Sequence, residues 1–383
     1  MRELITRLPA SKIREVADAG MGRDDVLAFW FGESDEITSP AVREAAAASL
    51  MRGETFYSPN LGLPELRAAL SAYTSGLHGP VGIDRIAVTS SGVSALMIAM
   101  QALVSPGDEV VAVVPLWPNL CAQAEIMGAR LKRVSLEPKA GAWTLDLQAL
   151  LDAVTPDTRV LLLNAPNNPT GWTLSRDEQQ ALLEHCRRTG TWIVADEVYE
   201  RLYYAPGCVA APSFLDIAAP DDRLVVVHSF SKSFLMTGWR LGWMVVPPSV
   251  LAGVDKLIEF NTSCAPVFVQ RGGLAALAEA DTAVPALRER LQACRDRLLP
   301  ALAAMPGVEV SSPLGGMYAF FRVAGQDDSL ALAKRLVAEV GLGLAPGAAF
   351  GAEGEGWLRW CFASRDPARL DAGLGRLARA LGL

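Results

Sequence analysis

Between residues 85 and 228, short apolar runs alternate with segments of helical length, and this alternation constrains the fold more than any other feature. The predicted strands are 85–89, 109–114, 159–164, 192–195 and 224–228, and the predicted helices are 92–104, 118–128 and 175–189. Short apolar runs between helices are typical of parallel strands that are buried on both faces. The sequence therefore predicts an α/β fold with a mostly parallel central sheet flanked by helices.

The pattern changes near residue 284, and this change predicts a second, smaller domain. A long helical pattern is followed by short strands and two more helices, at 284–304, 308–310, 317–323, 329–341, 357–362 and 367–381. We therefore expect a large domain over 45–283 and a small α+β domain over 284–383. Residues 1–44 are expected to be irregular and to pack with the small domain. A chain of 383 residues is long enough for such a division.

The net charge of the chain indicates which classes of binding partner are not expected. The chain has 35 Lys and Arg against 42 Asp and Glu, a net charge of −7. Binding of nucleic acid or of an anionic membrane requires a basic excess, so we expect neither. The first residues carry charges where a signal peptide is apolar, and no run of about 18 apolar residues occurs, so we expect a cytoplasmic protein. The three histidines share no metal-ligand spacing, so no metal site is expected.

One of the six lysines has an unusual setting. Lys232 lies in the Ser-rich sequence HSFSKSFLMTGWRLGW, directly after the predicted strand 224–228. Ligands bind at the carboxyl ends of strands in open α/β sheets. A partly desolvated lysine at that edge has a lowered pKa and can form a Schiff base, whereas an ordinary solvated lysine is the alternative. Ser229 and Arg240 could clamp a phosphate there, and a surface ion pair is the alternative.

Three further stretches follow predicted strands at the same edge. Asp196 ends the strand at 192–195, and Tyr199 comes three residues later. A carboxylate there needs a cation or a donor, although a capping role is the alternative. Asn168 lies in a turn rich in Asn, Pro and Gly that would fix its amide toward a ligand, or would be a plain turn. Residues 91–93 (Ser91, Gly92 and Val93) begin a predicted helix, whose N–H groups favour phosphate.

In combination, these stretches resemble a known family. The segments NNPTG (167–171), ADEVY (195–199) and SFSKSFLMTGWRLG (229–242), in this order and with these gaps, are similar to those of the class I and II aminotransferases. These are pyridoxal-phosphate enzymes of fold type I. The resemblance covers nearly the whole chain and implies the cofactor pyridoxal 5'-phosphate (PLP).

The resemblance implies a role for each residue. Lys232 is similar to the lysine that holds the cofactor as a Schiff base. Asp196 is similar to the acid that keeps the pyridine nitrogen protonated, because a carboxylate there raises the pKa of that nitrogen. Tyr199 and Asn168 resemble the pair that donates to the phenolic oxygen of the ring. The implied phosphate cup consists of Ser91, Gly92, Val93, Ser229 and Arg240, and Trp117 resembles the aromatic residue that stacks on the ring.

The same resemblance implies substrate contacts and a dimer. Arg359, in WLRWCFAS, resembles the arginine that binds the substrate α-carboxylate, and Gly32 resembles a glycine beside the same carboxylate. Tyr57 is similar to a tyrosine that reaches the phosphate of the neighbouring subunit, which implies a homodimer with shared active sites. Four residues, Trp30, Phe31, Met317 and Tyr318, indicate an apolar or aromatic side-chain pocket, or else ordinary core packing.

The implied activity is transfer of the amino group of an amino acid to a 2-oxo acid in a ping-pong cycle. In this cycle Lys232 removes the α-proton and returns it to the cofactor. Relatives with this fold also catalyse elimination and other reactions, so a PLP-dependent lyase is the main alternative. A non-catalytic PLP-binding module is a third possibility. It is disfavoured because Lys232, Asp196 and Arg359 are all present.

Overall fold

A seven-stranded sheet forms the centre of the computed structural model, which describes residues 1–139 and 141–383. Across the sheet the strands are β2 (Ile86–Thr89), β10 (Gly242–Val245), β9 (Leu224–Ser229), β8 (Trp192–Asp196), β7 (Thr158–Asn164), β3 (Glu109–Val114) and β4 (Arg130–Ser135). Only β10 runs antiparallel to its neighbours. The predicted α/β architecture is therefore confirmed. The sequence interpretation had not identified β4 and β10.

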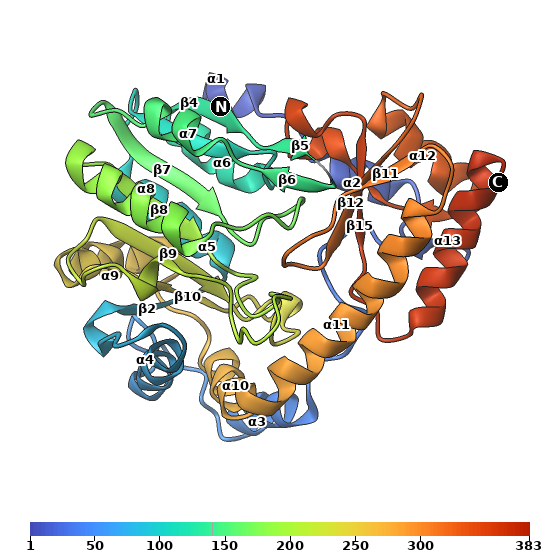
Figure 1. Cartoon of the computed structure of the whole chain (residues 1–383). Coiled ribbons are helices and arrows are strands. Elements are labelled where there is room, and N and C mark those ends of the chain that lie inside the picture. Colours follow the sequence, from blue (N-terminus) through green and yellow to red (C-terminus); the bar gives the residue numbers. More distant parts are fainter. Residues whose placement is uncertain (140) are drawn as a thin grey trace.

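Helices cover both faces of this sheet (Figure 1). Along β3, Val110 and Ala112 contact a cluster with α5 (Gly92–Leu103), α6 (Pro118–Ile126) and α9 (Pro248–Thr262). The intervening Val111 belongs to the core on the other face, as expected from the two-residue period of a strand. That face packs against α3 (Pro40–Met51), α4 (Pro64–His78), α8 (Arg176–Thr189) and α10 (Val267–Ala278). Along the chain, the elements between β4 and β7 are β5 (Glu137–Lys139), β6 (Ala142–Thr144) and α7 (Leu147–Ala153).

A second, four-stranded sheet lies at the other end of the molecule (Figure 1). Its order is β11 (Val308–Val310), β12 (Tyr318–Val323), β15 (Trp357–Cys361) and β14 (Ala345–Pro346), with helices α11 (Ala280–Ala303), α12 (Ser329–Val340) and α13 (Pro367–Leu381). The predicted small α+β unit is thus present. The boundary expected between 283 and 284 falls inside α11, and the domain boundaries stay predictions.

The first 40 residues contain short regular elements where an irregular chain was expected. Two helices form there, α1 (Glu3–Arg7) and α2 (Lys12–Asp18), and α2 contacts β14 and α12. The strand β1 (Leu27–Ala28) pairs in parallel with β13 (Leu342–Gly343). These pairings bring the N-terminal segment against elements of the C-terminal region.

Helix boundaries follow capping chemistry where the sequence carries it. The predicted capping box at the start of α8 is confirmed: Ser175 Oγ accepts from the N–H of Glu178, and the Glu178 carboxylate accepts from the N–H of Ser175 at 2.7 Å. Over residues 1–139 and 141–383, every helix is too short or too polar to cross a bilayer.

Candidate active site

The carboxyl ends of β2, β3, β7, β8 and β9 face a cavity of about 600 Å³. This is the edge of an open α/β sheet where ligands bind. Eleven of the thirteen predicted site residues line the cavity, namely Gly32, Gly92, Val93, Trp117, Asn168, Asp196, Tyr199, Ser229, Lys232, Arg240 and Arg359. Residues that are far apart in the sequence therefore line the same cavity, as expected if they form a single active site.

Lys232 provides the amine of the cavity. It follows β9 in a short turn, and its Nζ donates to the carbonyl of Gly32 at 2.6 Å. Burial lowers the pKa of Lys232 to about 8, and the charges of Arg359 and Arg240 act in the same direction. About a tenth of the amine is therefore uncharged at pH 7, far more than for an ordinary lysine, and the uncharged form is the one that attacks a carbonyl.

Asp196 provides a buried carboxyl group at the end of β8. Its Oδ1 accepts from the N–H of Val198 at 3.3 Å, and this is its one side-chain hydrogen bond within the described chain. Burial raises the pKa of Asp196 to about 7, although the Val198 N–H, His228 and Lys232 oppose this effect. The carboxylate is therefore poorly compensated, and a ligand that presents a positive N–H group would satisfy it.

Two tyrosines stand beside the amine. The hydroxyls of Tyr199 and Tyr318 are 2.7 Å apart, and Lys232 Nζ lies 5.7 Å from the centre of the Tyr199 ring. Burial raises the pKa of Tyr318 to about 12 and that of Tyr199 well above its ordinary value, so both remain protonated donors. Gly32 leaves room for this pair, because a Cβ at that position would lie 2.1 Å from the Tyr318 hydroxyl.

Arg359, on β15, places a second anchor in the cavity. Its Nη1 donates to Asn168 Oδ1 at 2.8 Å and its Nη2 to the Trp30 carbonyl at 2.5 Å. Its guanidinium also lies 4.3 Å from the Tyr318 ring centre. The buried Nε has no partner in the described part of the chain. Because Asn168 Oδ1 faces the arginine, its amide nitrogen is left to donate elsewhere.

A further group of cavity residues is suited to an anion. Ser229 Oγ and Ser231 Oγ are 2.9 Å apart, and Arg240 Nη1 approaches Ser231 Oγ at 3.4 Å. Gly92 and Val93 of the same cavity form the first turn of α5, where backbone N–H groups favour negative charge. Hydroxyls, a guanidinium and a helix start together match the chemistry of a phosphate group.

Comparison with known proteins identifies the family. The family model for aminotransferase class I and II matches residues 26–377. The chain belongs to this family. The aspartate aminotransferase of Pyrococcus horikoshii is 30% identical over 383 residues, which cover 99% of this chain and 96% of that protein. The enzyme is therefore a transaminase, and the relatives do not favour the lyase alternative.

Solved structures of other aminotransferases have the same fold as this chain over nearly its whole length. The aspartate aminotransferase of Thermotoga maritima has a TM-score of 0.89 and 31% identity, with 100% of both chains covered. An Escherichia coli protein with a methionine aminotransferase function has a TM-score of 0.91 and 25% identity, with 99% of both chains covered. The architecture is fold type I, as the sequence resemblance implied.

Two predicted residues of the aminotransferase lie outside the cavity lining. Ser91 is buried at the N-cap of α5, where its Oγ accepts from the N–H of Ser94 at 3.0 Å. Its side chain therefore caps the helix, and Gly92 and Val93 face the cavity. Tyr57 is 88% exposed on the single chain. Its predicted contact with a neighbouring subunit stays a prediction.

The cavity also contains residues that are not among the thirteen predicted site residues. Ser231 lies within the SFSK segment and completes the anion cradle, so a search for hydroxyls beside Ser229 could have found it. Phe31 and Tyr318 of the indicated side-chain pocket do line the cavity. Arg14, from α2, also lines it, and no local pattern of the sequence marked this residue.

Replacing Arg359 with lysine is expected to raise the KM for the amino acid about 100-fold with a smaller change in kcat, because an ammonium cannot form the two parallel bonds of a guanidinium with a carboxylate. Steady-state kinetics at saturating second substrate would measure this. Arg322→Lys is a matched control, since Arg322 lies on the neighbouring strand β12 and pairs with Glu309 at the surface. An unchanged KM in Arg359→Lys would contradict the assignment.

Proposed function

We propose that this aminotransferase binds PLP in the cavity and transfers the amino group of an L-amino acid to a 2-oxo acid. One observation carries the proposal: the lowered-pKa amine of Lys232, the uncompensated carboxyl of Asp196 and the anion cradle around Ser229 and Arg240 line a single cavity. These groups fit the aldehyde, the ring nitrogen and the phosphate of PLP, in that order. When bound there, PLP would supply an electron sink for the electrons of the substrate Cα–H bond.

Each of the remaining roles in the reaction would belong to a residue of the chain. Asp196 would hold a proton on the ring nitrogen by electrostatic attraction, and Tyr199 and Asn168 would donate to the ring oxygen. Arg359 would fix the substrate α-carboxylate and so orient the Cα–H bond. Lys232 Nζ, uncharged and close to that bond, would accept the α-proton and return it one carbon away.

The substrate side chain would meet the N-terminal segment. Arg14 lines the cavity, and its guanidinium carbon lies 5.6 Å from the centre of the Phe31 ring. This arginine is a cation additional to Arg359 and Arg240, which the proposal assigns to the α-carboxylate and the phosphate. We infer that a side-chain carboxylate is favoured. The name of the Pyrococcus relative, an aspartate aminotransferase, points to the same donor.

A homodimer with shared sites is the quaternary structure that we propose. Tyr57 lies in an exposed apolar segment with Met51 and Phe56, and exposed apolar groups of this kind mark interaction surfaces. A second copy that covers this segment would place Tyr57 near the partner's anion cradle.

The visible absorption spectrum of the PLP-loaded enzyme tests the proposal. We expect an absorption band of the Lys232-bound cofactor that disappears on addition of aspartate and returns on addition of a 2-oxo acid. A panel of single amino acids, neutral and acidic, would identify the donor. Spontaneous recovery of the band with release of ammonia would instead indicate elimination. A spectrum without a protein-bound cofactor band would overturn the proposal.

A further inference from the structure

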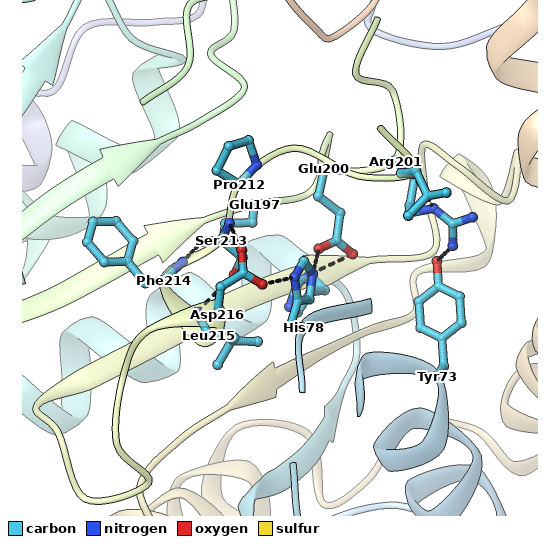
Figure 2. A network of polar contacts seen from close by, with 12 residues as sticks. Tyr73, His78, Glu197, Glu200, Arg201, Pro212, Ser213, Phe214, Leu215 and Asp216 are labelled. Carbon is cyan, nitrogen blue, oxygen red and sulfur yellow. Dashed lines mark hydrogen bonds and ion pairs between the residues drawn. The ribbon is translucent and has the colours of Figure 1, made fainter. Parts of the chain in front are cut away.

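A buried polar network joins α4 to the residues that follow β8 (Figure 2). His78, near the end of α4, bonds through Nδ1 to Asp216 Oδ1 and through Nε2 to Glu200 Oε2, each at 2.8 Å. Arg201 Nη1 also donates to the hydroxyl of Tyr73 on α4 at 2.7 Å. Helix α4 therefore holds residues 196–201, called here the acidic turn, at two points. The same turn carries Asp196 and Tyr199.

The hydrogen bonds of His78 determine its charge. An ionised carboxylate can only accept a hydrogen bond, so two carboxylate partners require a proton on each ring nitrogen. Although burial opposes a charged ring, Asp216 and Glu200 raise the pKa of His78 to about 10, and Glu197 acts in the same direction. Asp216 is also paired with Arg176 at 2.8 Å. The ring of His78 beside the acidic turn is therefore an imidazolium, held between the carboxylates of Asp216 and Glu200.

This charge is connected to Asp196 through two further groups. The second oxygen of Glu200, Oε1, lies 3.4 Å from Nδ1 of His228, the residue before Ser229 on β9. Although burial alone would raise the pKa of Glu200, His228 and His78 hold it well below its ordinary value. His228 in turn lowers the pKa of Asp196. His78 and His228 therefore face the two oxygens of the Glu200 carboxylate, and His228 is the member of this group that acts electrostatically on Asp196.

The carboxylates of this network are already bound by hydrogen-bond donors of the chain. Glu197, Glu200 and His228 offer ligand atoms within 4.8 Å of one another, which would also suit a cation. However, Glu197 accepts from Ser213 Oγ at 2.5 Å and from the N–H of Phe214 at 3.2 Å, and Glu200 accepts from His78. The arrangement is therefore a hydrogen-bonded charge network that positions the turn.

We propose that His78 is a positioning residue for transamination: its buried imidazolium fixes Glu200, and so holds Asp196 and Tyr199 in place and favours the carboxylate form of Asp196. A buried carboxylate that loses its cation is strongly destabilised. Without His78, the negative charge of Glu200 would no longer be compensated by the imidazolium and would act more strongly on His228 and Asp196. The acidic turn would also lose one of its two hydrogen-bonded links to α4. The inference rests on the proposed function, because Asp196 acts on the ring nitrogen of PLP.

A double-mutant cycle with the PLP-free protein tests the inference. The dissociation constant of PLP would be measured by absorbance for wild type, His78→Gln, Asp196→Asn and the double variant. A rise of one unit in the pKa of Asp196 reduces its ionised fraction by up to about tenfold, so we expect His78→Gln to weaken binding about 5-fold in the wild-type background. In the Asp196→Asn background the change should stay within about twofold. His185→Gln, which removes a half-buried histidine on α8, is the matched control.

The possible outcomes separate the inference from the proposed function. Wild type that fails to bind PLP would overturn both. Wild type that binds PLP, combined with equal effects of His78→Gln in the two backgrounds, would overturn the inference alone and indicate general loss of packing.

A second measurement does not depend on whether a variant folds. The chain has three histidines, so ¹⁵N-labelled histidine gives a simple spectrum of wild type. Both nitrogens of His78 should remain protonated above about pH 8, where an ordinary imidazole is neutral. A neutral His78 ring at that pH would overturn the inference.

Discussion

Replacement of Lys232 with alanine is expected to lower the rate of transamination by about 10⁴-fold or more, because the variant lacks both the cofactor-binding amine and the proposed general base. Nothing else in the described cavity offers an amine, since the other lining residues with positive charge are arginines. Amino-group transfer measured with a coupled assay would give the rate. The visible band of the protein-bound cofactor should be lost in the same variant.

Lys256→Ala provides the control for this substitution. Lys256 is an exposed lysine on α9 and does not line the cavity. Its replacement should leave both the rate and the absorption band unchanged. If Lys232→Ala retained a tenth of the wild-type rate, the assigned role of Lys232 would be untenable, even if PLP still bound to the protein.

Replacement of Asp196 with asparagine is expected to lower kcat by about 10³-fold, because the neutral amide cannot stabilise a positive charge on the ring nitrogen. The substitution nearly preserves shape, so the fold should persist. Single-turnover kinetics with saturating amino acid would measure the loss. Asp152→Asn is the matched control, since Asp152 is exposed on α7 and away from the cavity.

The pH dependence of cofactor binding gives a second readout of Asp196. Burial raises the pKa of Asp196 to about 7 in the protein without a ligand, so its carboxylate is ionised above pH 7 and protonated below. The affinity for PLP should therefore fall as the pH decreases through about 7. Asp196→Asn should remove this contribution and leave the dependence due to Lys232, whose pKa is about 8. An unchanged pH profile in Asp196→Asn would contradict the role of the carboxylate.

Much of the site could be predicted because each functional residue follows a recognisable strand. Asp196, Ser229 and Asn168 lie at or just beyond the ends of β8, β9 and β7, and parallel strands bring their carboxyl ends to one edge. Local sequence thus fixes both the residue type and its place. The start of α8 was equally predictable, because its capping box involves residues only three apart.

The remaining features depend on contacts that no local pattern records. The strand β4 is an edge strand with alternating charged residues, so its sequence resembles a loop more than a buried strand. The hydrogen bond between His78 and Glu200 joins residues that are 122 positions apart in the sequence. The local sequence around each residue is that of an ordinary polar side chain and does not indicate the contact. The helix start at Ser91 was identified, but whether its hydroxyl faces the cavity or caps α5 depends on side-chain orientation.

The location of Arg359 has a mechanical consequence. This arginine belongs to the four-stranded sheet, whereas Lys232 and Asp196 follow strands of the seven-stranded sheet. A substrate whose α-carboxylate is held by Arg359 and whose amino group is held by the cofactor, among residues of the seven-stranded sheet, would be a tie between the two sheets. Any rotation that separates the sheets would stretch this tie. Substrate binding would therefore favour the closed arrangement, and product release would require the two halves of the molecule to relax apart.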